Sequence, residues 1–178
     1  SEIQEMYLDI ERKQLIAVCD GYVGGKWNDD DYGYGQRANT TAVTYDISDR
    51  ENPKEVGRVS QSGYYNSSRI ADGYLYLFSD YYVTLDGITA KNPKSYIPLV
   101  NDNLIEETDI CLPSISKADM YSIITSVSLE NPDETAHSKA LLADGGNLYV
   151  SNDNIYFYEN VWQYSGKDVT TIRKVSYE

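Results

Sequence analysis

The sequence feature that most constrains the fold is a pattern of strand and turn signals that occurs twice. In the first copy, residues 45–48 precede the pair Asn52-Pro53, and in the second copy, residues 125–128 precede Asn131-Pro132 in the same way. Further matches are Ile70-Ala71-Asp72-Gly73 with Leu75-Tyr76, and Leu142-Ala143-Asp144-Gly145 with Leu148-Tyr149. A weaker third copy covers residues 9–18. Self-similarity of this kind indicates a repeat architecture, in which neighbouring units bury a shared core.

The segments inside each copy alternate between apolar and polar residues. Within residues 41–47, Val43 and Tyr45 share one face, whereas Thr44 and Asp46 take the other. A period of two residues is typical of a half-buried strand. Further strand-like segments lie at residues 15–18, 74–78, 121–127, 148–150, 155–158 and 170–175.

Each copy predicts four short strands joined by an Asn-Pro turn, a Gly turn and a further short turn. In the first copy, Asp72-Gly73 has the form that a tight β-hairpin requires. Four antiparallel strands per repeat is the sequence form of a β-propeller blade. We therefore expect an all-β chain with two to three blades. It would hold a partial blade at 1–40, blade-like repeats at 41–100 and 121–169, and the start of a further strand at 170–178.

Composition and charge exclude several classes of function. The chain has 178 residues and a formal net charge of −13, whereas nucleic acids and anionic membranes attract clustered Lys and Arg. The longest clean apolar run, residues 15–19, is far shorter than the roughly 20 residues of a transmembrane helix. We expect no nucleic-acid partner and no membrane insertion.

One His and two Cys are too few for a four-ligand zinc site. Cys19 and Cys111 either form a bridge or, as their sparse spacing favours, are two small buried hydrophobes.

Five segments, taken in order, carry a resemblance to a known family. They are residues 43–54, 63–69 with 75–77, 96–98, 145–151 with 155–156, and 170–175. Together they resemble a bacterial secreted family, described as a C-terminal beta-propeller domain and distantly related to WD40 repeats. Members are long extracellular proteins, so the resemblance implies an extracellular or cell-surface location. Because this chain is short beside such members, the resemblance also implies a fragment of a larger propeller.

An incomplete arc of blades has a physical consequence. Blades stack face to face, and about three repeats are needed before the shared core is well buried. Two to three blades leave apolar faces open at both ends of the arc. Unless further blades cover those faces, copies of the chain would cover them for each other. We therefore expect self-association of the isolated segment, or sheet edges covered by loops.

The main candidates for ligand contact are aromatic residues in the predicted loops. Tyr gives rigid contact area with a polar tip, which suits the recognition of sugars and peptides. The candidate residues are Trp27, Tyr32, Tyr34, Tyr64, Tyr65 and Trp162. The alternative is that Tyr, a good strand former, fills the interfaces between blades. We expect a glycan or protein ligand, contacted by loops at one end of the blades.

The acidic run Asp29-Asp30-Asp31 is the candidate metal site. Carboxylate oxygens suit Ca²⁺, although the run lacks the spaced ligands of an EF-hand. The alternative is an exposed, solvated loop over residues 24–35, and no other cofactor is expected. The runs Asn101-Asp102-Asn103 and Asn152-Asp153-Asn154 are interpreted as turns, because Asn and Asp bond to their own backbone and tolerate left-handed conformations.

The sequence gives little support for catalysis. His137 lies in a polar connector, residues 133–139, near Ser138 and Asp133, but a catalytic triad depends on spatial geometry rather than adjacency. We therefore favour a non-enzymatic binding or scaffolding module. The alternatives are a hydrolase whose active site is completed by blades outside this chain, and a purely structural segment. A hydrolase predicts His137 or paired carboxylates converging in a cleft, whereas a binding module predicts exposed aromatic side chains.

Overall fold

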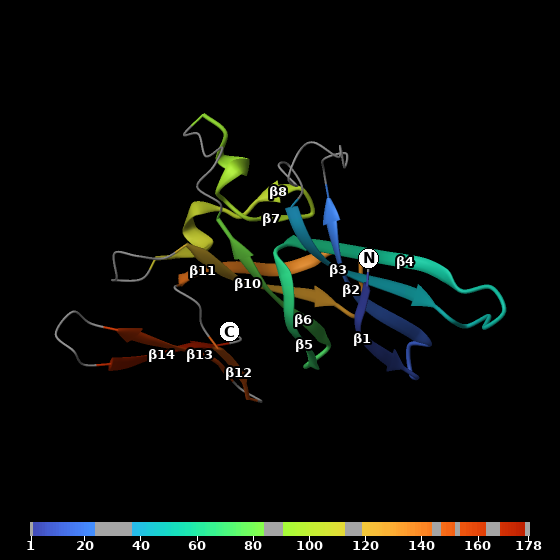
Figure 1. Ribbon diagram of the computed structural model, residues 1–178. Helices are drawn as coiled ribbons and strands as arrows, with labels where there is room; N and C mark the ends of the chain where they lie inside the picture. Colours follow the sequence, from blue (N-terminus) through green and yellow to red (C-terminus); the bar gives the residue numbers. More distant parts are fainter. Residues whose placement is uncertain are drawn as a thin grey trace.

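The structure is a computed structural model, and it describes residues 2–23, 37–83, 91–112, 119–143, 147–151, 154–162 and 168–176. These residues are built mainly from β-strands, which form three sheets (Figure 1). Helical structure among them is confined to two short 3-10 turns, Pro93–Ser95 and Glu107–Asp109. No helix in the described ranges is long and apolar enough to cross a membrane. The expectation of an all-β fold is confirmed.

Each of the three sheets is built around antiparallel strands, which are consecutive in the chain except where β6 pairs with β10 in the second sheet. The first sheet contains β1 (Glu2–Asp9), β2 (Gln14–Val23), β3 (Arg37–Asp46) and β4 (Lys54–Ser62), extended by the short strands β7 (Leu99–Val100) and β8 (Asn103–Leu104). The second contains β5 (Tyr64–Ala71), β6 (Tyr74–Tyr82), β10 (Met120–Ser128) and β11 (Thr135–Ala143), with β9 (Ile110–Cys111) parallel to β11. The third contains β12 (Asn147–Val150), β13 (Asn154–Trp162) and β14 (Asp168–Ser176).

The sheets and the sequence repeats have different boundaries. Repeat 41–100 includes β3 and β4 of the first sheet but β5 and β6 of the second, and repeat 121–169 is divided in the same way between the second and third sheets. The offset arises because the Asn-Pro turns lie inside a sheet: Asn52-Pro53 joins β3 to β4, and Asn131-Pro132 joins β10 to β11. Residues 1–40, expected to be a partial blade, supply β1, β2 and the start of β3 to a sheet with four long strands.

Two of the expected turns are confirmed by their backbone angles. Asp72 and Gly73 join β5 to β6 with φ of 49° and 82°, and Asn101 and Asp102 join β7 to β8 with φ of 47° and 61°. Positive φ at both central residues is the requirement of a type I′ hairpin, whose twist matches that of the flanking strands. In the run 152–154, only Asn154, the first residue of β13, is described.

The second sheet packs against both of the others, with one of its faces toward each. On β6, Leu75 and Leu77 belong to the core shared with the first sheet, whereas Tyr76 and Phe78 belong to the core shared with the third. The first sheet contributes Ile16, Val18, Ala42 and Val59, and the third contributes Ile155 and Phe157. Burial of both faces explains why residues 74–78 form a nearly continuous apolar run.

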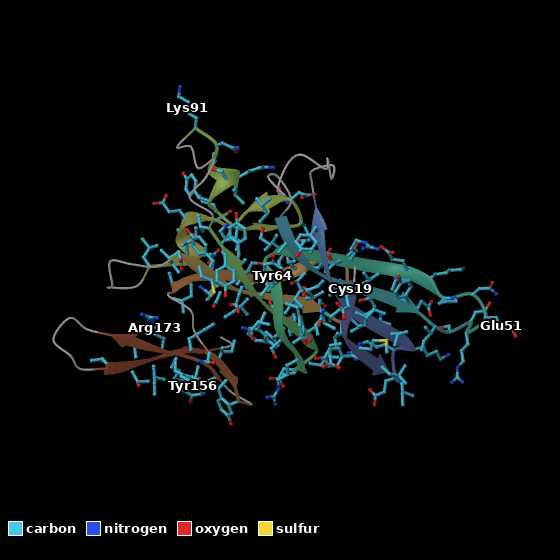
Figure 2. All side chains as sticks on the ribbon, in the orientation of Figure 1. Cys19, Glu51, Tyr64, Lys91, Tyr156 and Arg173 are labelled. Carbon is cyan, nitrogen blue, oxygen red and sulfur yellow. The ribbon has the colours of Figure 1, made fainter. Side chains whose placement is uncertain are left out.

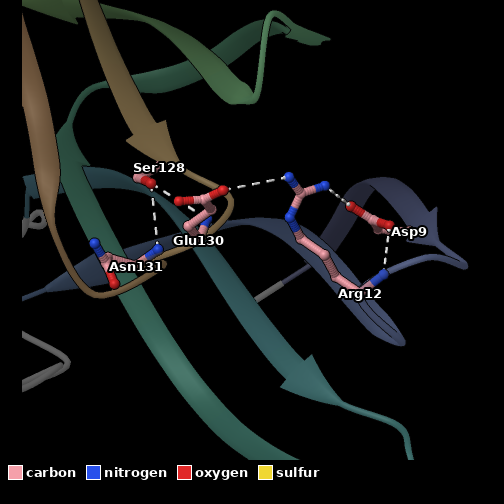
Figure 3. A network of polar contacts seen from close by, with 5 residues as sticks. All are labelled: Asp9, Arg12, Ser128, Glu130 and Asn131. Atoms are coloured by element: carbon pink, nitrogen blue, oxygen red, sulfur yellow. Dashed lines mark hydrogen bonds and ion pairs between the residues drawn. The ribbon is translucent and has the colours of Figure 1, made fainter.

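A polar network joins the first two sheets at the β1–β2 and β10–β11 turns (Figure 3). The Arg12 guanidinium lies 3.0 Å from Asp9 Oδ2 and 3.9 Å from Glu130 Oε1. The backbone N–H of Arg12 donates to the Asp9 carboxylate, which is the main reason why the pKa of Asp9 lies below its ordinary value. Ser128 Oγ accepts hydrogen bonds from the N–H groups of Glu130 and Asn131, each 3.2 Å long, and so shapes the turn that presents Glu130.

Both cysteines are free. Cys19 is half-buried on β2, whereas Cys111 is exposed on β9. The expectation of two buried hydrophobes is therefore wrong for Cys111, because the two-residue strand β9 lies at the edge of the second sheet.

Candidate binding site

Two exposed tyrosines from different sheets meet at the end of the first and second sheets. Tyr22 lies near the end of β2, and Tyr64 is the first residue of β5 (Figure 2). Their ring centroids are 6.1 Å apart at an interplanar angle of 84°, an edge-to-face contact, and their hydroxyl oxygens are 3.5 Å apart. Tyr22 is 60% exposed and Tyr64 is 45% exposed. Aromatic side chains are more often packed than presented in this way, so the pair is a candidate contact surface.

The position of this pair is set by Asp20, which lies two residues before Tyr22 on β2. Asp20 Oδ1 accepts a 2.8 Å hydrogen bond from the backbone N–H of Tyr65, the residue after Tyr64. The buried Thr40 hydroxyl, on β3, lies 3.2 Å from Asp20 Oδ1 and 2.9 Å from the Gly63 carbonyl oxygen, so its single proton is shared. These hydrogen bonds therefore join the end of β2 and the first half of β3 to the start of β5.

A surface hollow of about 420 Å³ opens beside the tyrosine pair. Its lining residues are Glu2, Gln4, Asp20, Gly21, Tyr22 and Tyr64, and we call this site the Tyr22–Tyr64 hollow. Hydrogen bonding to Tyr22, with smaller contributions from burial and the negative charge of Asp20, raises the pKa of Tyr64, so this residue keeps its phenolic proton at neutral pH. The hollow thus combines aromatic surface with hydroxyl, amide and carboxylate groups.

Tyr65, the neighbour of Tyr64 and also a predicted contact residue, lies on the opposite side of β5. It is half-buried, and its hydroxyl is 3.0 Å from Ser68 Oγ, which is 2.9 Å from the hydroxyl of Tyr7 on β1. Burial is the main cause that raises the pKa of both Tyr7 and Tyr65. Tyr64 is therefore exposed at the surface, whereas Tyr65 packs in the contact between the first and second sheets.

The remaining predicted site residues lie outside the described part of the chain or at its margin. Trp27, Tyr32, Tyr34, Asp29, Asp30 and Asp31 all fall within residues 24–36, which are not described. Trp162 ends β13, but its side chain is not described. The predicted loop 24–35 follows β2 directly, so its first residue is bonded to the strand end that carries Tyr22. Within the described residues, no group of three or more His, Cys, Asp or Glu gathers as metal ligands would.

His137 does not lie in a connector, as its polar neighbours indicated, but within strand β11. Its backbone N–H donates to Ser126 Oγ at 3.1 Å, which fixes it against β10. His137 and Ser138 line a second hollow of about 290 Å³ together with Glu106 and Asp109. Asp109 Oδ1 also lies 3.5 Å from Lys139 Nζ. We call this site the His137 hollow.

The comparison with known families decides what the three sheets are. The family described as Beta propeller domain matches residues 1–178. The chain belongs to this β-propeller family. No curated protein and no solved structure matches the chain.

In a β-propeller, each sheet is one blade. We name β1–β4 blade 1, the strands β5, β6, β10 and β11 blade 2, and β12–β14 blade 3. The Tyr22–Tyr64 hollow then lies between blades 1 and 2, at the end where β2 finishes and β5 begins. Of its aromatic residues, Tyr64 is a contact residue predicted from the sequence, whereas Tyr22 was not predicted.

Proposed function

We propose that this chain is a non-enzymatic binding module whose ligand, a glycan or a peptide, is contacted at the blade 1–blade 2 end through the Tyr22–Tyr64 hollow. We propose further that it belongs to a bacterial protein that is secreted or attached to the cell surface, and this part rests on the sequence resemblance alone. The calcium site at Asp29, Asp30 and Asp31 stays a prediction of the sequence.

The observation that carries the proposal is the exposed tyrosine pair, held by buried structure at the rim of a hollow. Asp20 and Thr40 fix the strand ends beneath it, so both rings are positioned before any ligand arrives. A positioned aromatic side chain loses little conformational freedom on binding, which favours affinity. Sugars and peptides both offer apolar faces to aromatic rings and hydroxyl or amide groups to the surrounding polar atoms.

Replacing Tyr64 by Ala is expected to weaken ligand binding about tenfold or more, because central aromatic residues dominate most binding energies. The measurement is a glycan and peptide array screen of the chain, followed by calorimetric titration of the strongest ligand with the wild type and the variant. Tyr82→Ala is the matched control, because Tyr82 is 55% exposed at the end of β6 but does not line the hollow. Equal losses in both variants, or no bound ligand on either array, would contradict the proposal.

A hydrolase is the second candidate, and the His137 hollow is the observation in its favour. His137 shares this hollow with Glu106 and Asp109, so an imidazole and carboxylates line one concave surface. Against a catalytic dyad, the carboxylate of Asp109 is paired with Lys139. Hydrolysis of an array ligand that His137→Ala abolishes, while Tyr64→Ala leaves it intact, would favour the hydrolase over the binding module.

A further inference from the structure

We propose that the Tyr22–Tyr64 hollow takes a cationic group, such as the Arg or Lys side chain of a peptide ligand. This inference rests on the proposed binding function and narrows it from glycan or peptide to a basic peptide. It depends on the charge of the described lining residues, on the Oδ2 atom of Asp20, which accepts no hydrogen bond from the described residues, and on the two aromatic rings.

The described lining residues of the hollow carry negative charge. Glu2 and Asp20 both line the hollow, and among the lining residues that the structure describes there is no Lys or Arg. In the described part of the chain, the salt bridges of Arg and Lys residues involve other carboxylates, at Asp9, Glu55, Asp109 and Glu130. An entering cation would therefore meet two carboxylates without displacing an internal partner.

Asp20 keeps half of its hydrogen-bonding capacity for a ligand. Its Oδ1 atom is occupied by the Tyr65 N–H and the Thr40 hydroxyl. Among the described residues, no donor is bonded to its Oδ2 atom. A guanidinium or ammonium group could bond to this oxygen while the structural contacts of Oδ1 stay in place, and charge-assisted hydrogen bonds of this type are the stronger ones.

The tyrosine rings add a second source of selectivity for a cation. The face of an aromatic ring carries negative electrostatic potential, so it attracts a guanidinium or ammonium group placed over it. Tyr22 and Tyr64 are both more than one-third exposed, so ring surface remains open to a ligand. A neutral sugar would gain from the rings but not from the two carboxylates. The combination therefore favours a cation over a neutral ligand of similar size.

The test compares two peptides that differ only in charge, acetyl-Gly-Arg-Gly-amide and its citrulline counterpart. Binding is followed by ¹H–¹⁵N NMR titration of the 178-residue chain, and we expect the Arg peptide to bind about tenfold more tightly. Glu2→Gln and Asp20→Asn should each remove much of this preference, and Asn at position 20 retains an acceptor for the Tyr65 N–H. Asp102→Asn, at the exposed β7–β8 turn, is the control and should change nothing.

Equal affinity for the Arg and citrulline peptides would overturn the inference, as would a preference for Arg that survives both Glu2→Gln and Asp20→Asn. A neutral oligosaccharide is titrated in parallel. If it binds in a Tyr64-dependent way while the Arg peptide shows no preference, the cation inference fails and the proposed function stands. If no ligand binding depends on Tyr64, both fail.

A separate observation concerns the outer faces of blades 1 and 3. A β-bulge in β1 between Ile3 and Glu5 places Ile3, Met6 and Leu8 on one face of the first sheet. Their cross-strand partners on β2 are Cys19, Ala17 and Leu15 in turn. This is the face of blade 1 that points away from blade 2, and Ile3, Met6 and Leu8 are 57%, 57% and 59% exposed. On the outer face of blade 3, Tyr149, Tyr158 and Ile172 are 62%, 39% and 67% exposed.

We infer that, in the 178-residue segment taken by itself, these two faces bind each other between two copies, in a head-to-tail arrangement. Within one chain, blade 2 already receives blade 1 on one face and blade 3 on the other. The outer face of blade 3 and the outer face of blade 1 are the two halves of a third contact of the same kind. A second copy supplies the missing half at each end, which buries the apolar residues of both.

Light scattering coupled to size-exclusion chromatography is expected to show a species larger than the monomer at about 100 μM protein, since weak interfaces need such concentrations. Leu8→Lys and Ile172→Lys should each give monomers, whereas Leu112→Lys, a control at a 72% exposed apolar residue outside both faces, should not. Mixing the two monomeric variants should restore a dimer, because each retains one intact face. A wild-type monomer, or no recovery on mixing, would overturn the head-to-tail contact.

Discussion

Gly57→Ala is expected to lower the free energy of unfolding by about 3 kcal/mol, the upper end of the usual cost of overpacking a core. Gly57 is a buried residue of β4 that lies against the β10–β11 turn of blade 2. A Cβ atom at this position would stand 2.4 Å from the carbonyl carbon and oxygen of Pro132 and 2.7 Å from the backbone nitrogen of Asp133. These are backbone atoms, so no side-chain rotation can relieve the clash, and blades 1 and 2 must separate.

The measurement for Gly57→Ala is equilibrium urea unfolding followed by circular dichroism. Gly73→Ala is the control, because a Cβ atom at Gly73 meets no atom within 4 Å. Its φ of 82° makes the control strained in its backbone, so it should cost about 1–2 kcal/mol. An unfolding free energy for Gly57→Ala equal to that of the wild type would show that blade 2 does not approach β4 as described.

Asp20→Ala is expected to cost about 2 kcal/mol of unfolding free energy, because it leaves the partly buried Tyr65 N–H without an acceptor and removes one of the two acceptors of Thr40. The Tyr65 N–H would lose its acceptor, and the buried Thr40 hydroxyl would retain the Gly63 carbonyl alone. The same change frees the start of β5, so Tyr64 loses its fixed position beside Tyr22. Ligand binding should therefore weaken together with stability.

Urea unfolding of Asp20→Ala and Asp20→Asn separates the positioning contribution of this residue from its charge. Asp20→Asn retains an oxygen acceptor, so its unfolding free energy should lie much nearer to that of the wild type. If both variants were equally stable, the hydrogen bonds of Asp20 to β3 and β5 would have no part in joining the blades.

The parts of the fold that follow local chemistry could be predicted from the sequence. Asp72-Gly73 predicted a hairpin, and both residues adopt the positive φ that a type I′ turn needs. The apolar run at 74–78 predicted a strand, and four of its five residues, 75–78, are buried in β6. The grouping of strands into sheets was not accessible, because a glycine marks both the β5–β6 turn within blade 2, at Gly73, and the connection from β4 to β5 between blades, at Gly63.

The candidate site was harder to predict because it depends on contacts between distant strands. Tyr22 follows Asp20 and Gly21, which resemble a strand end, yet β2 continues to Val23 because it pairs with β3 along its whole length. Tyr64 and Tyr65 were selected together, and only tertiary packing separates their roles. His137 was assigned to a connector because its neighbours are polar, whereas β11 is paired with β10 there and presents His137 on an exposed surface.

The central claim is that ligand binding occurs at the blade 1–blade 2 end through the tyrosine pair. A ¹H–¹⁵N NMR titration of the chain with the strongest array ligand tests it most directly, because every described backbone amide reports its own position. The account predicts that the largest shifts fall at residues 20–22 and 64–65, and that Tyr64→Ala abolishes them. Largest shifts around the His137 hollow or on blade 3, unchanged by Tyr64→Ala, would contradict it.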